Sequence, residues 1–172
     1  MSISIIIPSQ NDLDELKICL NKINDQILLP DEVIIIDSST DYKILNYLEN
    51  KKINFYRFNL ILKKINKCFA GKSINIGINL SQKKYIGFLD TKTYPEKNWL
   101  SIAMSKFNDK TIDVIFGSTF FTANSKFEEF AKAISYGNIS HETTPGSIIK
   151  RYLLEDKNLF FNENLRSGYD II

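Results

Sequence analysis

The chain has 172 residues, 44% of them hydrophobic and 24% charged, a composition that suits one globular domain with a sizeable core. Its 22 basic and 20 acidic residues give a formal charge of +2, which provides no electrostatic argument for nucleic acid as a partner. The apolar runs are strand-sized, so we expect no membrane span. The absence of a leader pattern and of a CxxC pair favours a cytoplasmic protein with reduced thiols.

The first part of the chain predicts a strand–helix–strand unit. SISIIIP, residues 2–8, is a β-branched run closed by proline, and EVIIID, residues 32–37, is a second apolar strand. Asp12 with Glu15 resembles a capping box at the start of the intervening helix. Apolar residues recur in that helix at spacings of three and four, namely Leu13, Leu16, Leu20, Ile23 and Ile27. A helix between two such strands predicts parallel pairing.

Strands and helices continue to alternate along the rest of the chain. Further strands are predicted at residues 53–59 (INFYRFN), 85–90 (YIGFLD) and 113–122 (DVIFGSTFFT). A turn followed by a helix is predicted at 38–50 (SSTDYKILNYLEN). Further helices are predicted at 71–82 (GKSINIGINLSQ), 95–107 (PEKNWLSIAMSKF), 125–135 (SKFEEFAKAIS) and 147–156 (SIIKRYLLED). The alternation predicts a single α/β domain with a Rossmann-like, mostly parallel central sheet flanked by helices.

Polar side chains follow three of the predicted strands. Ser9 and Asn11 follow the first, Asp37 ends the second and Asp90 ends the fourth. Each has a structural explanation, because Ser9 and Asn11 could cap a helix and Asp37 could anchor a turn. In open α/β sheets, however, ligands bind beyond the carboxyl ends of the strands. Three polar strand ends at one edge therefore favour a binding site.

Several other sites are disfavoured by the loops. Neither GxGxxG nor GxxxxGK[ST] occurs, which argues against a common dinucleotide fold and a P-loop protein. His141, the only histidine, has no GxSxG partner motif. We expect it in a surface loop, and the alternative is a role on the acceptor side. The lysines at positions 63, 64 and 67, with those at 83 and 84, are typical of a solvated helical face.

Five segments in order resemble family 2 glycosyltransferases with the GT-A fold. ISIIIPSQND is similar to their opening strand and P-T-Y-N turn, and EVIIIDSSTD to the second strand with its acidic turn. GKSINIGI resembles G-x-A-R-N-x-G-I with Ile74 in place of the arginine. YIGFLDTKTYPEKNWL resembles the strand, acidic motif and Pro-x-x-W-L helix, and LFFNENLRSGYD resembles F-D-E-x-L-x-x-G-E-D.

The resemblance implies transfer of a sugar from a nucleotide-diphosphate donor to a hydroxyl acceptor by an inverting displacement. Asp170 is the implied general base, which must lie within hydrogen-bonding reach of the acceptor hydroxyl. The implied donor site includes Asp37 at the nucleobase and Asp90 at the ribose or metal. Its other implied members are Pro8 and Ser9 at the base, and Gly71, Lys72, Asn75 and Lys92 toward the ribose and diphosphate.

Lys92 stands where the family commonly has the second aspartate of D-x-D, a metal ligand. A protonated lysine cannot ligate a cation. Asp90 could hold Mn²⁺ or Mg²⁺ with the diphosphate supplying most ligands. Alternatively Lys92, together with Lys72, could neutralise the diphosphate directly, or Lys92 could face solvent in a protein that binds without turnover.

The chain stops two residues after Asp170, where family members usually continue. We therefore expect residues 1–172 to form one GT-A-like domain without the usual acceptor-side extension: a minimal form, a fragment, or a protein that has lost activity. The alternative function is an inactive module on the same fold that binds a nucleotide sugar or a protein partner. A third hypothesis, a phosphoacceptor domain, leaves the Pro-x-x-W-L helix and the NLRSGYD tail without a role.

Overall fold

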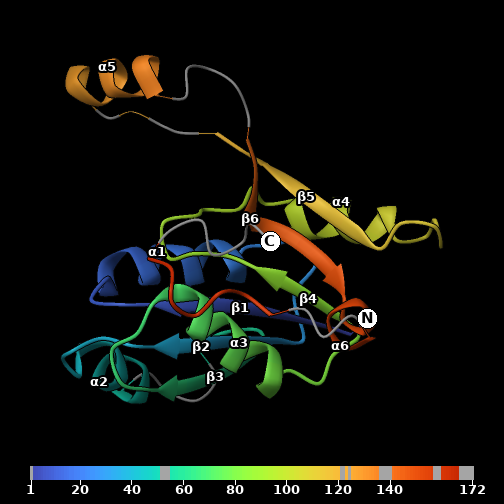
Figure 1. Ribbon diagram of the computed structural model, residues 1–172, viewed down its shortest axis with the longest axis horizontal. Helices are drawn as coiled ribbons and strands as arrows, with labels where there is room; N and C mark the ends of the chain where they lie inside the picture. The colour runs from blue at the N-terminus through green and yellow to red at the C-terminus, as the bar shows by residue number, and fades with distance from the viewer. Residues whose placement is uncertain are drawn as a thin grey trace.

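The structure is a computed structural model that describes residues 2–50, 55–120, 123, 125–135, 141–156 and 160–166. Strands and helices alternate along the chain in the order expected of an α/β fold (Figure 1). The elements are β1 (Ile3–Ser9), α1 (Leu13–Asn24), β2 (Glu32–Asp37), α2 (Lys43–Asn50), β3 (Asn59–Lys64), α3 (Ala70–Leu80), β4 (Tyr85–Phe88), α4 (Trp99–Lys106), β5 (Val114–Thr119), α5 (Lys126–Ser135), β6 (His141–Lys150) and α6 (Arg151–Asp156).

The described strands form one six-stranded sheet in the order β3-β2-β1-β4-β6-β5. β1 pairs in parallel with both β2 and β4, and β2 pairs in parallel with β3. β6 runs antiparallel to β4 and to β5. The predicted mostly parallel α/β sheet is confirmed, and the parallel strands direct their carboxyl ends to one edge.

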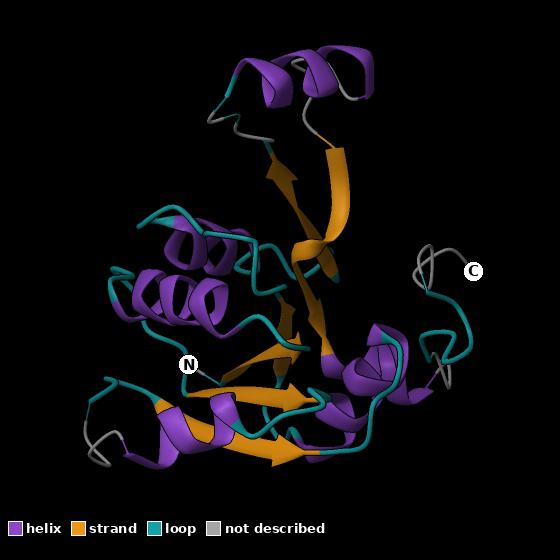
Figure 2. Cartoon of the chain, turned by 90° about the vertical axis from the view of Figure 1, so that its left-hand side faces the viewer, coloured by secondary structure: helices purple, strands orange, loops and turns teal. Residues whose placement is uncertain are grey.

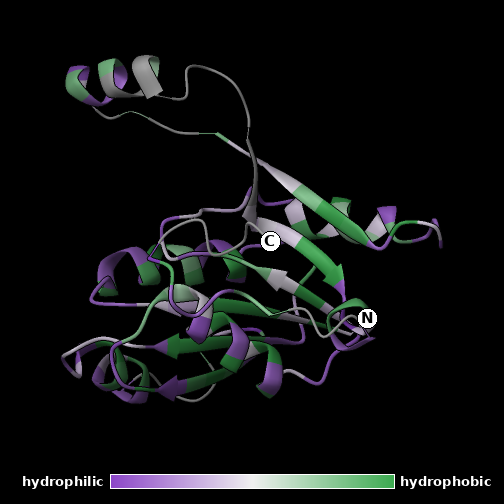
Figure 3. Ribbon diagram, in the orientation of Figure 1, coloured by the Kyte–Doolittle hydropathy of each residue, from purple (hydrophilic) through white to green (hydrophobic). Residues whose placement is uncertain are grey.

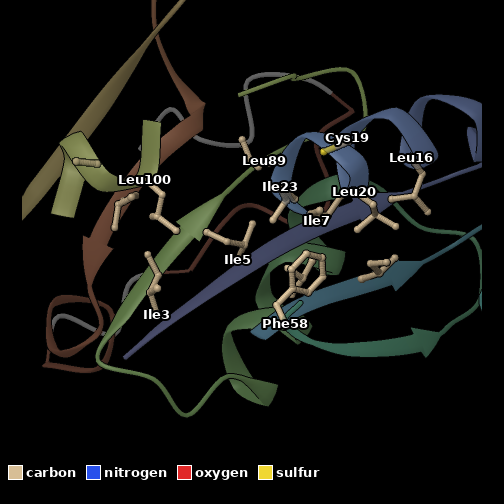
Figure 4. Close-up of a cluster of buried hydrophobic side chains, with 14 of the residues drawn as sticks. Ile3, Ile5, Ile7, Leu16, Cys19, Leu20, Ile23, Phe58, Leu89 and Leu100 are labelled. Atoms are coloured by element: carbon tan, nitrogen blue, oxygen red, sulfur yellow. The ribbon is translucent and has the colours of Figure 1, made fainter. Parts of the chain in front are cut away.

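Side chains of β1 alternate between two buried layers, as expected of a strand covered on both faces. Ile3, Ile5 and Ile7 join a cluster with residues of α1, α2 and α4 (Figure 4). Ile6 points to the opposite face, where it packs with residues of α3 and α6. Helices therefore cover both faces of the sheet (Figure 2), and the central strands are hydrophobic along their length (Figure 3).

The third strand lies later in the sequence than predicted. β3 is Asn59–Lys64, and it pairs with β2 through Val33 opposite Leu60 and Ile35 opposite Leu62. The aromatic residues before it form a bend instead: Phe58 is buried in the core and stacks on Tyr56 with ring centroids 5.2 Å apart. Aromatic content suggested a strand here, but the aromatic side chains fill the core from a loop.

The predicted helix at 147–156 is wrong in its first part. Ile148 and Ile149 lie in β6, where they pair with Gly87 and Ile86 of β4, and the helix α6 begins only at Arg151. Two adjacent β-branched residues favour a strand over a helix. His141 likewise begins β6, opposite Thr119 of β5, and does not lie in a surface loop as expected.

The paired strands β5 and β6 extend beyond the other four strands and carry α5 away from the rest of the chain (Figures 1 and 2). Phe127 and Phe130 of this helix are exposed, at 79% and 62%.

In the part of the chain that the structure describes, no helix has both the length and the apolar character needed to cross a bilayer.

Candidate nucleotide-binding edge

The residues predicted from three strand ends do meet at one edge of the sheet. Ser9, the last residue of β1, is the direct parallel neighbour of Asp37, the last residue of β2. Asp90 follows β4, which pairs with the other side of β1. Their side chains are brought together by strand order alone, because parallel neighbours end at the same edge.

Asp37 is wholly buried, with 0% of its surface exposed. Its Oδ1 accepts a hydrogen bond of 2.8 Å from the backbone N–H of Ser39. Its Oδ2 forms an ion pair with the Nζ of Lys64 at 3.1 Å but accepts no hydrogen bond. Asp37 therefore anchors the turn after β2, the structural role expected for it, and its second oxygen can still accept a hydrogen bond.

Lys64 is a residue that the sequence analysis assigned to a solvated helical face, and the structure corrects this. It ends β3, and its ammonium donates to the carbonyl of Asp41 at 2.9 Å and to that of Ser39. Together with the ion pair to Asp37, these contacts hold the turn after β2 against the end of β3. A lysine at the last position of an apolar strand was the available signal.

The turns after β1 and β2 are tied to each other by side chains. Asn11 adopts the left-handed conformation, with φ of 58°, and its backbone N–H donates to Ser39 Oγ at 2.7 Å. Its Oδ1 accepts from the backbone N–H of Thr40 at 3.1 Å. Gln10 Nε2 reaches Ser38 Oγ at 3.2 Å and the carbonyl of Cys68 at 3.3 Å. These contacts connect the turns after β1 and β2 with the loop that precedes α3.

Asp12 does not form the predicted capping box, because its side chain makes no cap hydrogen bond to α1. Its Oδ1 accepts from Ser9 Oγ at 2.5 Å and from the backbone N–H of Gln10 at 3.0 Å. Its Oδ2 accepts from Thr91 Oγ1. Asp12 therefore joins the turn after β1 to the turn after β4, and a rule based on local spacing could not reveal this long-range role.

Asp90 is the least satisfied carboxylate of the edge. Its Oδ1 is buried and has no hydrogen-bond partner. Burial raises the pKa of Asp90, the negative charge of Asp12 raises it further, and the ammonium of Lys92 opposes both effects. The exposed Lys92 therefore lies close enough to Asp90 to act on it electrostatically.

A divalent metal at this edge would find few protein ligands. Among the described residues there is no group of three or more histidine, cysteine, aspartate or glutamate side chains placed to hold a metal ion. Asp90 offers one carboxylate, beside a lysine whose charge repels cations. The described residues alone therefore do not form a protein-held metal site.

Three of the predicted residues lie on α3. Lys72 is exposed in its first turn, whereas Gly71 and Asn75 are buried against residues 160–166. Asp170 lies outside the described residues.

Comparison with solved structures identifies the fold. The fold matches TarS 1-349 of S. aureus in complex with UDP-GlcNAc, with a TM-score of 0.74 and 21% identity over 99% of this chain and 51% of that one. It also matches the mannosyltransferase PcManGT of Pyrobaculum calidifontis in complex with GDP-Man and Mn²⁺, with a TM-score of 0.69 and 18% identity over 95% and 48%. The fold is therefore GT-A.

The chain belongs to glycosyl transferase family 2, whose model matches residues 4–166. It is 25% identical over 185 residues to the poly(ribitol-phosphate) beta-N-acetylglucosaminyltransferase TarS of Staphylococcus aureus, covering 99% of this chain and 31% of TarS. It is 22% identical to the glycosyltransferase AglE of Haloferax volcanii, covering 95% of this chain and 53% of AglE. The chain thus spans only a third to a half of the length of these relatives.

Proposed function

We propose that the chain carries the donor site and the base of an inverting glycosyltransferase that moves a sugar from a nucleoside diphosphate to a hydroxyl acceptor. The observation that carries the proposal is the presence of two buried carboxylate oxygens without a hydrogen-bond partner, Asp37 Oδ2 and Asp90 Oδ1. An unsatisfied buried polar atom costs about 1–3 kcal/mol, so such atoms are rare outside functional sites. Both lie at the edge where GT-A folds are expected to take the donor.

The two oxygens suit different parts of one ligand. Asp37 Oδ2, behind the turn held by Lys64, is an acceptor for an N–H of a nucleobase. Pro8 and Ser9 at the end of β1 would line the same pocket. Asp90 Oδ1 is an acceptor for a ribose hydroxyl. Base and ribose would thus lie across the ends of β2, β1 and β4, in strand order.

Lys92 would neutralise the diphosphate as it leaves. It is exposed beside Asp90, and Lys72 adds a second exposed cation in the first turn of α3. An ammonium opposite a phosphate supplies the charge stabilisation that transfer requires. Because the protein ligands for a metal are few, the proposal assigns no step to one.

The chemical step would be a single displacement. The acceptor oxygen forms a bond to the anomeric carbon while the bond from that carbon to the phosphate oxygen breaks, and the electron pair leaves with the nucleoside diphosphate. Asp170 would take the proton of the acceptor hydroxyl. The sugar configuration inverts because attack and departure occur on opposite faces.

The test compares Asp170→Asn with Asp156→Asn, an exposed carboxylate of α6 that serves as the matched control. We expect D170N to abolish release of UDP from UDP-GlcNAc in the presence of hydroxyl acceptors, while the affinity for UDP stays within about twofold. D156N should change neither quantity. A parallel loss of UDP affinity in D170N would contradict the separation of base and donor site.

The second candidate is a module that binds a nucleotide sugar without transferring it. The presence of Lys92 in place of the second D-x-D carboxylate favours it, because that change removes the usual metal ligand. This candidate predicts tight nucleotide binding and no release of nucleoside diphosphate with any acceptor, even in a longer chain.

A further inference from the structure

One face of α3, formed by Gly71 and Asn75, is occupied by the segment 160–166. Asn75 is 5% exposed and Gly71 is buried. The family resemblance implies that both lie beside the sugar donor, and their contacts decide between that role and a positioning role.

The amide of Asn75 is used by the segment. Its Nδ2 donates to the carbonyl of Phe161 at 2.9 Å and to Glu163 Oε1 at 3.0 Å. Its Oδ1 accepts the backbone N–H of Phe161 at 2.9 Å. An asparagine amide carries two N–H donors, and both are spent here. A phosphate of the nucleotide sugar, or a hydroxyl of the molecule that receives the sugar, would therefore find no free N–H on Asn75.

Gly71 permits the close approach of the segment backbone. A Cβ at this position would lie 2.3 Å from the carbonyl oxygen of Asn162 and 3.0 Å from its carbonyl carbon. Neither is the end of a flexible side chain, so any larger residue must push the segment away from α3. The absence of a side chain is what this contact requires.

Phe161 holds the segment from its other side. Its ring meets that of Phe88, at the end of β4, edge to face at a centroid distance of 5.4 Å. It also packs against the apolar cluster of the α3 face of the sheet. The segment is thus fixed to both α3 and β4.

We propose that Gly71 and Asn75 are positioning residues for the acceptor side of the site rather than donor ligands. Phe161 and Glu163, which Asn75 contacts, precede Asp170 by nine and seven residues in the sequence. The placement of the segment 160–166 sets where the chain that carries the base begins. This inference rests on the proposed function, since Asp170 has a catalytic role only there.

The experiment uses Asn75→Ala and Gly71→Ala, with Asn79→Ala as the control on the same helix. Asn79 is exposed one turn further on. We expect N75A and G71A to lower kcat for UDP release from UDP-GlcNAc by about 100-fold, the loss that small misplacements cause, with UDP affinity unchanged. N79A should match the wild type. Because alanine favours a helix over glycine, G71A should keep α3 folded.

Amide hydrogen exchange at Phe161 supplies a readout that needs no turnover. Loss of protection there in N75A, but not in N79A, supports the role of Gly71 and Asn75 in holding the segment 160–166, even if the wild type proves inactive. Inactivity of the wild type would then count against the proposed function alone. The inference is overturned if protection at Phe161 is unchanged, or if UDP affinity falls as much as kcat in N75A and G71A.

Discussion

The two halves of the candidate edge differ in how completely their polar groups are satisfied. At the ends of β1, β2 and β3, the side chains of Gln10, Asn11 and Lys64 make hydrogen bonds to the turn after β2. Among the buried side-chain atoms described there, Asp37 Oδ2 lacks a hydrogen bond. At the end of β4, the buried Oδ1 of Asp90 has no hydrogen-bond partner. Burial also raises the pKa of Asp90. Asp12 is the residue that joins the halves.

In the proposed site, the half formed by the ends of β1, β2 and β3 would be built before the ligand binds, whereas the ligand would complete the half at β4. A prebuilt wall lowers the entropy lost on binding and favours one ligand shape. An unsatisfied carboxylate lowers stability and is retained where a ligand later contacts it. Variants that remove polar contacts of the first half should therefore lower the stability of the protein. Removing the unsatisfied carboxylate of the second half should raise it.

The largest expected effect comes from Lys64→Met. The change leaves the buried carboxylate of Asp37 without its cation and frees the carbonyl of Asp41, which should lower the free energy of unfolding by ~3 kcal/mol in urea denaturation. The double variant Asp37→Asn with Lys64→Met should recover most of the loss. Lys63→Met, at an exposed position of the same strand, is the control. Equal losses of unfolding free energy in K63M and K64M would show that the ion pair between Lys64 and Asp37 does not stabilise the fold.

Asp12→Ala should be the next largest. It leaves the hydroxyls of Ser9 and Thr91 without their acceptor, at a cost of about 2 kcal/mol, and it should weaken UDP binding because both turns loosen. Asp14→Ala, an exposed carboxylate of the same helix, is the matched variant. An unchanged UDP affinity in D12A would show that the two halves act independently.

Asp90→Asn should stabilise the protein at neutral pH, by on the order of 1 kcal/mol, because it removes a buried charge. The pKa of Asp90 is raised above 3.8 in the folded protein, so the native state binds its proton more tightly than the unfolded chain does. The stability of the wild type relative to D90N should therefore fall as pH rises from 3.8 through that raised pKa. Urea denaturation of both proteins at several pH values measures this difference in unfolding free energy. A wild type that becomes more stable relative to D90N as pH rises would contradict the prediction.

The smallest effect concerns the two thiols. Cys19 is buried and its pKa is raised to about 12, mainly by burial, whereas Cys68 is partly exposed. We expect a maleimide to label Cys68 quickly and Cys19 only on unfolding. Labelling of both at equal rates in the native protein would show that α1 opens readily.

Much of the architecture could be predicted because it depends on local patterns. β-branched runs and helical spacing located β1, β2 and α1, and parallel strands then bring Ser9, Asp37 and Asp90 to one edge. The third strand was misplaced because an aromatic bend resembles a strand in sequence. The end of β6 was predicted as helix although its adjacent β-branched residues, Ile148 and Ile149, favour a strand.

The contacts within the site could not be predicted in the same way. Lys64 and Asp12 act through partners 23 to 79 residues away in the chain. Asn75 meets the segment 160–166 across 86 residues. Such pairings depend on three-dimensional packing, and periodicity carries no information about them.

The most direct test of the nucleotide-binding edge is a calorimetric titration with UDP, GDP, dTDP and CDP, each with and without Mn²⁺, repeated on Lys92→Gln. The account predicts that one of these nucleotides binds without Mn²⁺ and that K92Q weakens this binding about tenfold, since one phosphate contact is lost. Binding that requires Mn²⁺ and ignores Lys92, or no binding of any of the four, would contradict it.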